Sequence, residues 1–257
     1  MGTYKTWSAT RLSLGPLFFI THINDFSSII SKIANPILFA DDTSIIISHT
    51  NPEELKNNTN TVLNETINWF QSNFLTLNCN KTHFLQFLTK KHNRIKMQII
   101  SCNTIITNIN TTRFLELIIY SSLSWKDHII ELTSKLNKAC YAIWAIKPFM
   151  SLDAEKMIYY SFVQSLTSYG IIFWGNSHLT DSIFKVQKRI IRIITNAGKR
   201  DTCCQLYKQL QILPLPSLYI FLLLVLSIKI EACFCPILKF ITETHIITTI
   251  YICLPQI

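Results

Sequence analysis

Glycine is scarce in this chain, with five residues in 257, and no GxGxxG or GxxxxGK[ST] sequence occurs. Both patterns need glycines that let the backbone approach a phosphate group. Their absence excludes the common glycine-rich nucleotide-binding sites. Charged residues are also few, at 15%, whereas hydrophobic residues make up 49%. This composition is typical of a globular chain and excludes intrinsic disorder, and the length suits one large domain or two smaller ones.

Metal-ligand spacing is missing as well, although the chain has eight cysteines and seven histidines. No CxxC pair occurs, and no histidine stands at zinc-ligand spacing from a cysteine, so we expect reduced and mostly buried thiols. The apolar run after Arg11 is short, is broken by Gly15 and Pro16, and has no small-residue cleavage site. A secretory signal is therefore not expected, and the sequence predicts a cytoplasmic or nuclear protein.

A long apolar run is nearly absent. Residues 212–228 carry no charge and, at about 17 residues, reach the lower limit for crossing a bilayer. Pro214 and Pro216 shorten the unbroken part, which favours a buried core helix. No stable membrane association is expected, and a small membrane-associated protein stays open as an alternative.

Basic residues are concentrated in the middle of the chain. Residues 1–80 hold four Lys or Arg against six Asp or Glu, residues 81–200 hold 17 against six, and residues 201–257 hold three against three. The middle segment therefore carries all of the basic excess behind the net charge of +9. Such an excess indicates a polyanionic partner, nucleic acid first and an anionic membrane surface second, unless it is only a solvated face.

Hydrophobic periodicity predicts a mixed α+β part followed by an all-helical part. A helix is expected over residues 16–33, and Asn51 is expected to cap a second helix whose apolar face ends at Phe74. Short β-rich runs between residues 83 and 119 predict strands. Helices are then expected from about residue 125, after Ser151 and near Thr180. The change at about residue 120 is the predicted domain boundary.

The stretch ILFADDTSIIIS, residues 37–48, sets Asp41 and Asp42 side by side between two strand-like runs. Adjacent carboxylates disfavour each other's ionisation unless a cation compensates, and carboxylate oxygens are the ligands that Mg²⁺ prefers. The pair therefore indicates either a magnesium site for phosphoryl or nucleotidyl transfer or an ordinary polar turn.

The residues around this pair resemble the catalytic hairpin of reverse transcriptases, in the form found in jockey-like non-LTR retrotransposons. Further stretches resemble blocks of the same family in the same order. These are LGPLFFITHINDF (14–26), TINWFQSNFLTLNCNKTHFLQF (66–87), RFLELIIYSSLSWKDHI (113–129), SYGIIFWG (168–175), VQKRIIRII (186–194) and LQILPLPSLYI (210–220). The resemblance implies an RNA-directed DNA polymerase, a nucleotidyltransferase that uses Mg²⁺.

The resemblance also implies a fold and roles for single residues. Residues 1–120 would be a partial polymerase palm, a small antiparallel sheet with helices, residues 121–230 a helical thumb-like region, and residues 231–257 an unassigned tail. Asp41 would bind the metal directly and Asp42 would support it. Lys81 would lie near the leaving pyrophosphate, or else be a solvated turn lysine. Phe114 and Leu115 would lie at the primer grip, and Trp125 in the core. RNA template, DNA primer and, in the complete enzyme, deoxynucleotides would be the partners.

A basic helical face has support of its own from spacing. Lys185, Lys188, Arg189 and Arg192 share one side of a predicted helix. Its opposite side carries Ile183, Val186, Ile190 and Ile194. This arrangement fits a helix that packs on its domain and faces a phosphate backbone, although a solvated stripe has the same pattern.

The sequence departs from the family pattern at sites that matter for catalysis. The family's upstream palm aspartate, its fingers and its QGS sequence have no counterpart before Leu14, and Glu116 and Tyr120 replace a glycine and an aspartate. We therefore expect a C-terminal, truncated piece of a transposable-element polymerase that is inactive alone. A non-catalytic nucleic-acid-binding protein is the second interpretation.

Overall fold

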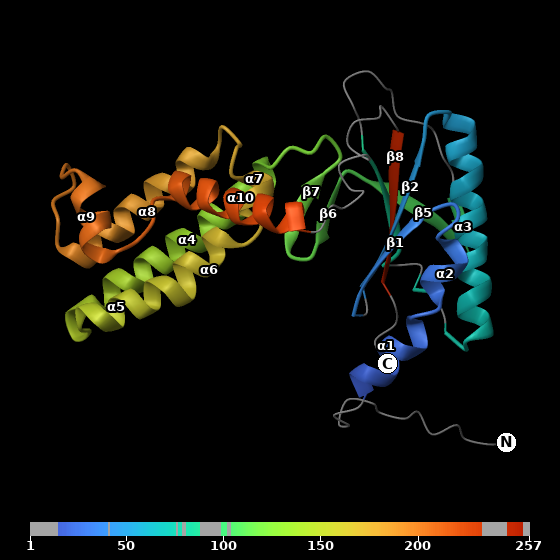
Figure 1. Cartoon of the computed structure of the whole chain (residues 1–257), viewed down its shortest axis with the longest axis horizontal. Helices are drawn as coiled ribbons and strands as arrows, with labels where there is room; N and C mark the ends of the chain where they lie inside the picture. The colour runs from blue at the N-terminus through green and yellow to red at the C-terminus, as the bar shows by residue number, and fades with distance from the viewer. Residues whose placement is uncertain are drawn as a thin grey trace. The chain divides into compact units, whose positions relative to one another are not determined.

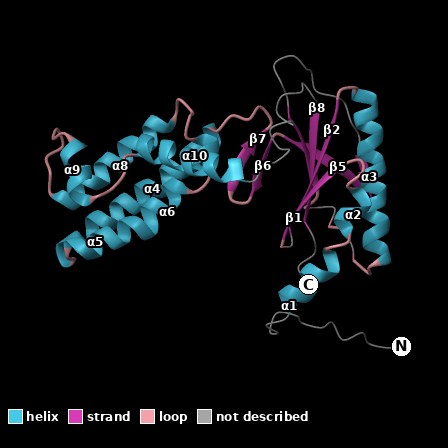
Figure 2. Cartoon of the chain, viewed as in Figure 1, coloured by secondary structure: helices cyan, strands magenta, loops and turns pink. Residues whose placement is uncertain are grey.

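The computed structural model describes residues 15–40, 42–75, 77–78, 81–87, 99–101, 104–232 and 246–253 (Figures 1 and 2). These residues form the mixed α+β fold that the sequence predicts. The chain divides into two compact units. Unit 1 comprises residues 1–112, 121–123 and 241–257, and unit 2 comprises residues 113–120 and 124–240.

Unit 1 is built on one sheet with the order β1-β2-β8-β3-β5-β4. Its strands are β1 (Asn35–Phe39), β2 (Asp42–His49), β3 (His83–Phe87), β4 (Ile99–Ser101), β5 (Thr104–Ile109) and β8 (Ile246–Cys253). Neighbouring strands are antiparallel except for the parallel pair β3 and β5. The tail for which the sequence indicates no role thus supplies a strand inside the sheet, between β2 and β3.

The stretch around the paired aspartates forms the expected β-ribbon. β1 and β2 pair in register from Asn35 opposite Ile46 to Phe39 opposite Asp42. Two residues, Ala40 and Asp41, therefore connect the strands. Ala40 has φ of 51°, a left-handed conformation that two-residue hairpin turns commonly require.

Helices α1 (Gly15–Ile23), α2 (Phe26–Ile30) and α3 (Pro52–Ser72) belong to the same unit, and α2 and α3 lie along one side of the sheet in Figure 1. The single helix predicted over residues 16–33 is wrong, because the chain breaks at Asn24 and Asp25. The Ser27 and Ser28 hydroxyls donate to the carbonyl oxygens of these two residues. Such local side-chain bonds compete with a continuous helix.

Helix α3 starts at the predicted cap, but it ends before the last residue of the predicted apolar face. The Asn51 side chain accepts a hydrogen bond from the Glu53 amide at 3.0 Å. Leu55, Val62 and Phe70 are buried in the unit 1 core. Phe74, however, is 98% exposed, because the helix ends at Ser72 and Phe74 adopts φ of 57°.

Unit 2 is mainly helical. A ribbon of β6 (Thr111–Phe114) and β7 (Leu117–Tyr120) leads into it. Its helical segments are α4 (Lys126–Ile146), η2 (Lys147–Phe149), α5 (Leu152–Ile158), η3 (Tyr159–Gln164), α6 (Ser165–Ser168), α7 (Ile171–Trp174), α8 (Thr180–Thr195), α9 (Cys203–Leu210) and α10 (Leu215–Ala232). The helix starts predicted near residue 125, after Ser151 and near Thr180 are confirmed.

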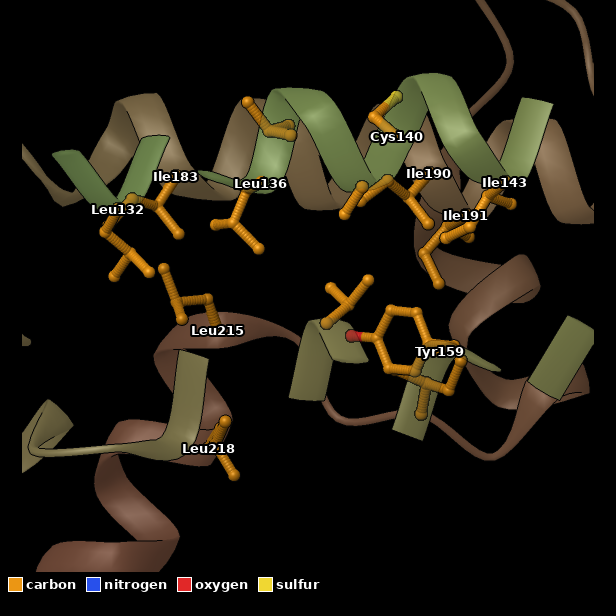
Figure 3. Close-up of a cluster of buried hydrophobic side chains, with 14 of the residues drawn as sticks. Leu132, Leu136, Cys140, Ile143, Tyr159, Ile183, Ile190, Ile191, Leu215 and Leu218 are labelled. Carbon is orange, nitrogen blue, oxygen red and sulfur yellow. The ribbon is translucent and has the colours of Figure 1, made fainter. Parts of the chain in front are cut away.

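The core of unit 2 lies between α4, α8, η3 and the start of α10. Figure 3 shows side chains from α4 and α8 meeting Tyr159 of η3 and the first turn of α10. The labelled members are Leu132, Leu136, Cys140, Ile143, Tyr159, Ile183, Ile190, Ile191, Leu215 and Leu218. Each buried Leu or Ile of this kind contributes about 1.5–3 kcal/mol to folding.

A buried glutamine on α8 connects four segments of unit 2, and we call this set of bonds the Gln187 network. The Gln187 side-chain amide donates to the Tyr159 hydroxyl at 2.8 Å and to the Leu213 carbonyl at 3.1 Å. Its side-chain oxygen accepts from the Tyr207 hydroxyl at 3.1 Å and from the Leu215 amide at 2.9 Å. The last bond satisfies an amide at the start of α10, which has no partner within its own helix.

Among the described helices, none is by itself both long and apolar enough to cross a bilayer. The bent pair formed by residues 203–210 and 215–229, with 51° between its two parts, meets the length and composition requirement only when both parts are counted.

Replacing Gln187 with leucine should lower the free energy of unfolding by at least about 2 kcal/mol, because several buried polar groups would lose their partners at once. Urea unfolding measures the change. Gln209→Leu, at an exposed position of α9, is the matched control and should change stability little. Equal losses in the two variants would show that the Gln187 network does not stabilise the fold.

Alkaline pH should weaken unit 2 through a buried tyrosine. Burial raises the pKa of Tyr159 from 10.0 to about 12, against a smaller opposing effect of the Gln187 hydrogen bond. Below pH 10 the phenol keeps its proton in both states. Between about pH 10 and 12 only the unfolded state loses it, so the free energy of unfolding should fall by about 1.4 kcal/mol per pH unit. Urea titrations at about pH 9 and about pH 11 should show a smaller fall for Tyr159→Phe than for the unmodified protein.

Candidate functional site

One of the two predicted metal ligands lies at the bend of the β1–β2 ribbon. Asp42 is the first residue of β2 and is exposed, and it pairs with Phe39 of β1 and Cys253 of β8. Asp41 lies outside the described residues. The structure therefore places one of the two predicted carboxylates at the turn of an antiparallel ribbon inside a sheet.

Lys81 lies at the same end of the sheet as Asp42. It is exposed, two residues before His83, and its amide donates to the Asn78 carbonyl at 3.1 Å. His83 and Ser44 both pair with Tyr251 of β8, so they are level across the sheet. Asp42 precedes Ser44 by two residues within β2, and Lys81 lies in the turn two residues before β3 begins, so both predicted site residues lie at the same end of the unit 1 sheet.

Asp42 is the one predicted metal ligand among the described residues. The described residues contain no group of three His, Cys, Asp or Glu side chains close enough to hold an ion. The strand beside β2 has the sequence IITTIYIC and supplies no carboxylate. Asp41 and Asp42 would offer two carboxylates from adjacent residues, and Mg²⁺ is commonly bound through one or two carboxylates together with substrate phosphates.

The predicted primer-grip residues form the turn between β6 and β7. Phe114 is the last residue of β6, and Leu115 and Glu116 adopt φ of 44° and 63°. Successive positive φ values are typical of a tight two-residue hairpin turn. The Leu115 carbonyl accepts a hydrogen bond from the Tyr169 hydroxyl at 2.5 Å. The turn is thereby held from within unit 2.

The SYGIIFWG stretch, residues 168–175, holds this turn, and its conformation depends on glycine. Gly170 has φ of 60°, and a Cβ there would lie 2.7 Å from a methyl group of Leu117 in β7. The indole of Trp174, which is fully buried, donates to the Tyr169 carbonyl at 3.1 Å. The SYGIIFWG stretch thus packs against β7 and positions Tyr169. Periodicity alone does not indicate this role, because the residues concerned are far apart in sequence.

Ion pairs beside the turn were not predicted from the sequence. Arg113 donates to both carboxylate oxygens of Glu131, at 2.9 and 3.2 Å, and also to Glu116 at 3.0 Å. Lys135 pairs with Glu131 at 2.8 Å. The Lys135 hydrogen bond and both cationic neighbours lower the pKa of Glu131. Burial lowers the pKa of His128, whose Nδ1 accepts from the Ile118 amide at 3.4 Å.

The predicted basic face of α8 lies opposite its buried face. Ile183, Val186, Ile190 and Ile194 are all buried in the unit 2 core, as predicted. Lys185 and Arg189 are exposed. The guanidinium of Arg189 donates to the Asn137 side-chain oxygen of α4 at 3.5 Å. These two basic residues can reach a ligand without leaving an ion pair among the described residues.

The other two basic residues of this face have partners within unit 2. The Lys188 ammonium lies 3.9 Å from the centre of the Phe184 ring. Arg192 donates through two nitrogens to the Asp201 carbonyl, at 3.0 and 3.1 Å. Both side chains are half-buried. The four predicted residues therefore divide into an exposed pair and a pair with structural contacts.

No protein-family model, no curated protein and no solved structure matches this chain.

Replacing both Lys185 and Arg189 with alanine should flatten the salt dependence of RNA binding. Each lost phosphate contact lowers the slope of log affinity against log salt by about 0.7 to 0.9. Fluorescence anisotropy of a labelled RNA across a salt series measures the slope. The matched control, Lys199→Ala with Lys208→Ala, removes two exposed charges elsewhere in unit 2. An equal slope in the unmodified protein and the α8 variant would rule out phosphate contacts by these residues.

Proposed function

We propose that this chain is the C-terminal part of an RNA-directed DNA polymerase of the non-LTR retrotransposon type. In this proposal it binds RNA template and DNA primer but does not catalyse nucleotidyl transfer by itself. Unit 1 corresponds to part of the palm and unit 2 to the thumb. The observation that carries the proposal is that Asp42 begins β2 and Lys81 precedes β3 at the same end of the unit 1 sheet.

Backbone conformation at the primer-grip turn supports the same proposal. The resembling family block has glycine where this chain has Glu116, and Glu116 adopts φ of 63°. Glycine adopts that conformation without the steric cost that a side chain brings. The ion pair between Glu116 and Arg113 accompanies the substitution. If the chain descends from the family block, the turn should keep a backbone conformation that suits glycine at this position, as Glu116 does.

The two glycines of the SYGIIFWG stretch also fit their counterparts in the family pattern. A Cβ on Gly170 would clash with Leu117, and a Cβ on Gly175 would lie 2.4 Å from the Tyr219 ring. Both positions are therefore restricted by packing. The segment acts through the Tyr169 hydrogen bond that holds the Leu115 carbonyl.

The lack of catalysis in the proposal follows from the strand beside β2. In nucleotidyl transfer by two metals, carboxylate-bound ions stabilise both the attacking and the leaving oxygen of the reacting phosphate. β8 occupies the position next to β2 and contributes only Ile, Thr, Tyr and Cys. By analogy, removing one oxyanion-hole donor from an enzyme costs about 10² to 10³ in rate. Asp41, Asp42 and Lys81 are then retained parts of an incomplete site.

A second candidate function is nucleic-acid binding with no ancestral catalysis. The exposed pair Lys185 and Arg189 on α8 favours it, because phosphate binding requires neither the ribbon nor Lys81. In the first candidate function the β1–β2 ribbon is part of an incomplete polymerase site, whereas in the second it has no catalytic ancestry.

Primer extension on an RNA template with Mg²⁺ tests the proposal. The chain should extend no primer, and Asp41→Asn should behave like the unmodified protein, because the site lacks a carboxylate from the neighbouring strand. A known reverse transcriptase in parallel reactions verifies the assay. Extension that disappears in Asp41→Asn would contradict the inactivity. Absent binding of an RNA–DNA hybrid would contradict the polymerase assignment itself.

A further inference from the structure

The outer face of α4 carries an exposed aromatic pair. Tyr141 is 68% exposed and Trp144 is 59% exposed, although large aromatic side chains normally gain from burial. Their ring centres lie 5.8 Å apart with an angle of 38° between the planes. Both residues face away from the side of α4 that packs in the unit 2 core, which Leu132, Leu136 and Ile143 form.

This aromatic pair adjoins a shallow groove of about 560 Å³ along α4. Its lining combines apolar, hydroxyl, amide and cationic groups. The lining residues are Ile130, Thr133, Ser134, Asn137, Lys138 and Tyr141. We call this surface, together with Trp144, the α4 groove. It offers an aromatic ring, an amide and an ammonium group within about three helical turns.

Helix α8 runs alongside α4 and brings its exposed cations to the groove. The hydroxyls of Thr133 and Ser182 lie 3.2 Å apart, and Arg189 donates to Asn137 one turn further along α4. Thr133 and Asn137 themselves line the groove. The guanidinium of Arg189 therefore lies at the groove's edge, with Lys185 one turn before it on the same face of α8.

The charge around the α4 groove is positive. Lys138 and Lys185 take part in none of the ion pairs that the described residues form. The nearby carboxylate of Glu131 is already paired with Arg113 and Lys135. A polyanion that binds here thus meets cations that have no ion pair. Repulsion by Glu131 is reduced, because its carboxylate is paired with two cations.

We propose that the α4 groove binds single-stranded nucleic acid. Tyr141 and Trp144 stack on successive bases, and Lys138, Lys185 and Arg189 contact the phosphates. Aromatic platforms beside cationic groups bind single strands in this manner, since every base has a face that can stack. The bases of a duplex are already stacked on each other, so the groove discriminates in favour of unpaired strands. This inference rests on the proposed nucleic-acid binding. It adds that the site binds single strands in preference to duplexes.

The test compares two double variants by anisotropy with three labelled probes. The probes are oligo(dT), an abasic oligomer with the same number of phosphates, and an RNA–DNA hybrid. Tyr141→Ala with Trp144→Ala removes the platform. Phe149→Ala with Phe162→Ala is the matched control, because these aromatics are 87% and 53% exposed and do not line the α4 groove.

The platform variant should bind oligo(dT) about tenfold or more weakly, with little change for the abasic oligomer and an unchanged salt slope. The control variant should bind all three probes as the unmodified protein does. The conservative variant Trp144→Phe should keep most of the affinity for oligo(dT), since phenylalanine also stacks on bases. Circular dichroism and urea unfolding verify that each variant is folded.

Two results would overturn the inference while leaving the proposed function intact. One is binding of the hybrid by the unmodified protein together with equal oligo(dT) affinities of the platform and control variants. The other is an equal loss for oligo(dT) and the abasic oligomer, which would assign the effect to phosphates. Failure of the unmodified protein to bind any probe would instead contradict the proposed function.

Discussion

The Gln187 network is the interaction on which the arrangement of unit 2 depends. One buried side chain bonds to η3, to α9, and to the residues before and at the start of α10. Each bond satisfies a polar group that would otherwise be costly to bury. Because these contacts fix one side of α8, its opposite side must face outward with Lys185 and Arg189. The position of the surface charge is thus determined by a neutral amide in the interior.

Much of the local structure could be predicted because its causes are local. Asn51 accepts a hydrogen bond from a helix-start amide, as its sequence position predicts, and Ser151 does the same at the start of α5, where a helix was expected to follow it. The alternating runs around Asp42 form the expected ribbon. By contrast, the break at Asn24 and Asp25 depends on serine hydroxyls bonding backward to the main chain. Phe74 continues the periodicity but lies beyond the end of the helix, where periodicity no longer describes the chain.

The candidate site was predictable by residue type and much less so by arrangement. Asp42 and Lys81 come to the same end of the sheet only through β8, a strand whose pairing with β2 and β3 has no signal in the local sequence. Spacing places all four cations on one face of α8, but it does not separate the exposed pair from Lys188 and Arg192, which have partners. The contact between Tyr169 and the Leu115 carbonyl joins residues 54 positions apart. Tertiary packing supplies each of these distinctions.

The central position of β8 has a consequence for synthesis on the ribosome. β2 and β3 leave the exit tunnel before the whole of unit 2, and their shared partner emerges only after residue 246. At ordinary elongation rates this interval lasts roughly ten to thirty seconds. During that time two strands of the nascent sheet present open edges, which readily pair with other chains. A chaperone that shields those edges until translation passes β8 would raise the yield of folded protein.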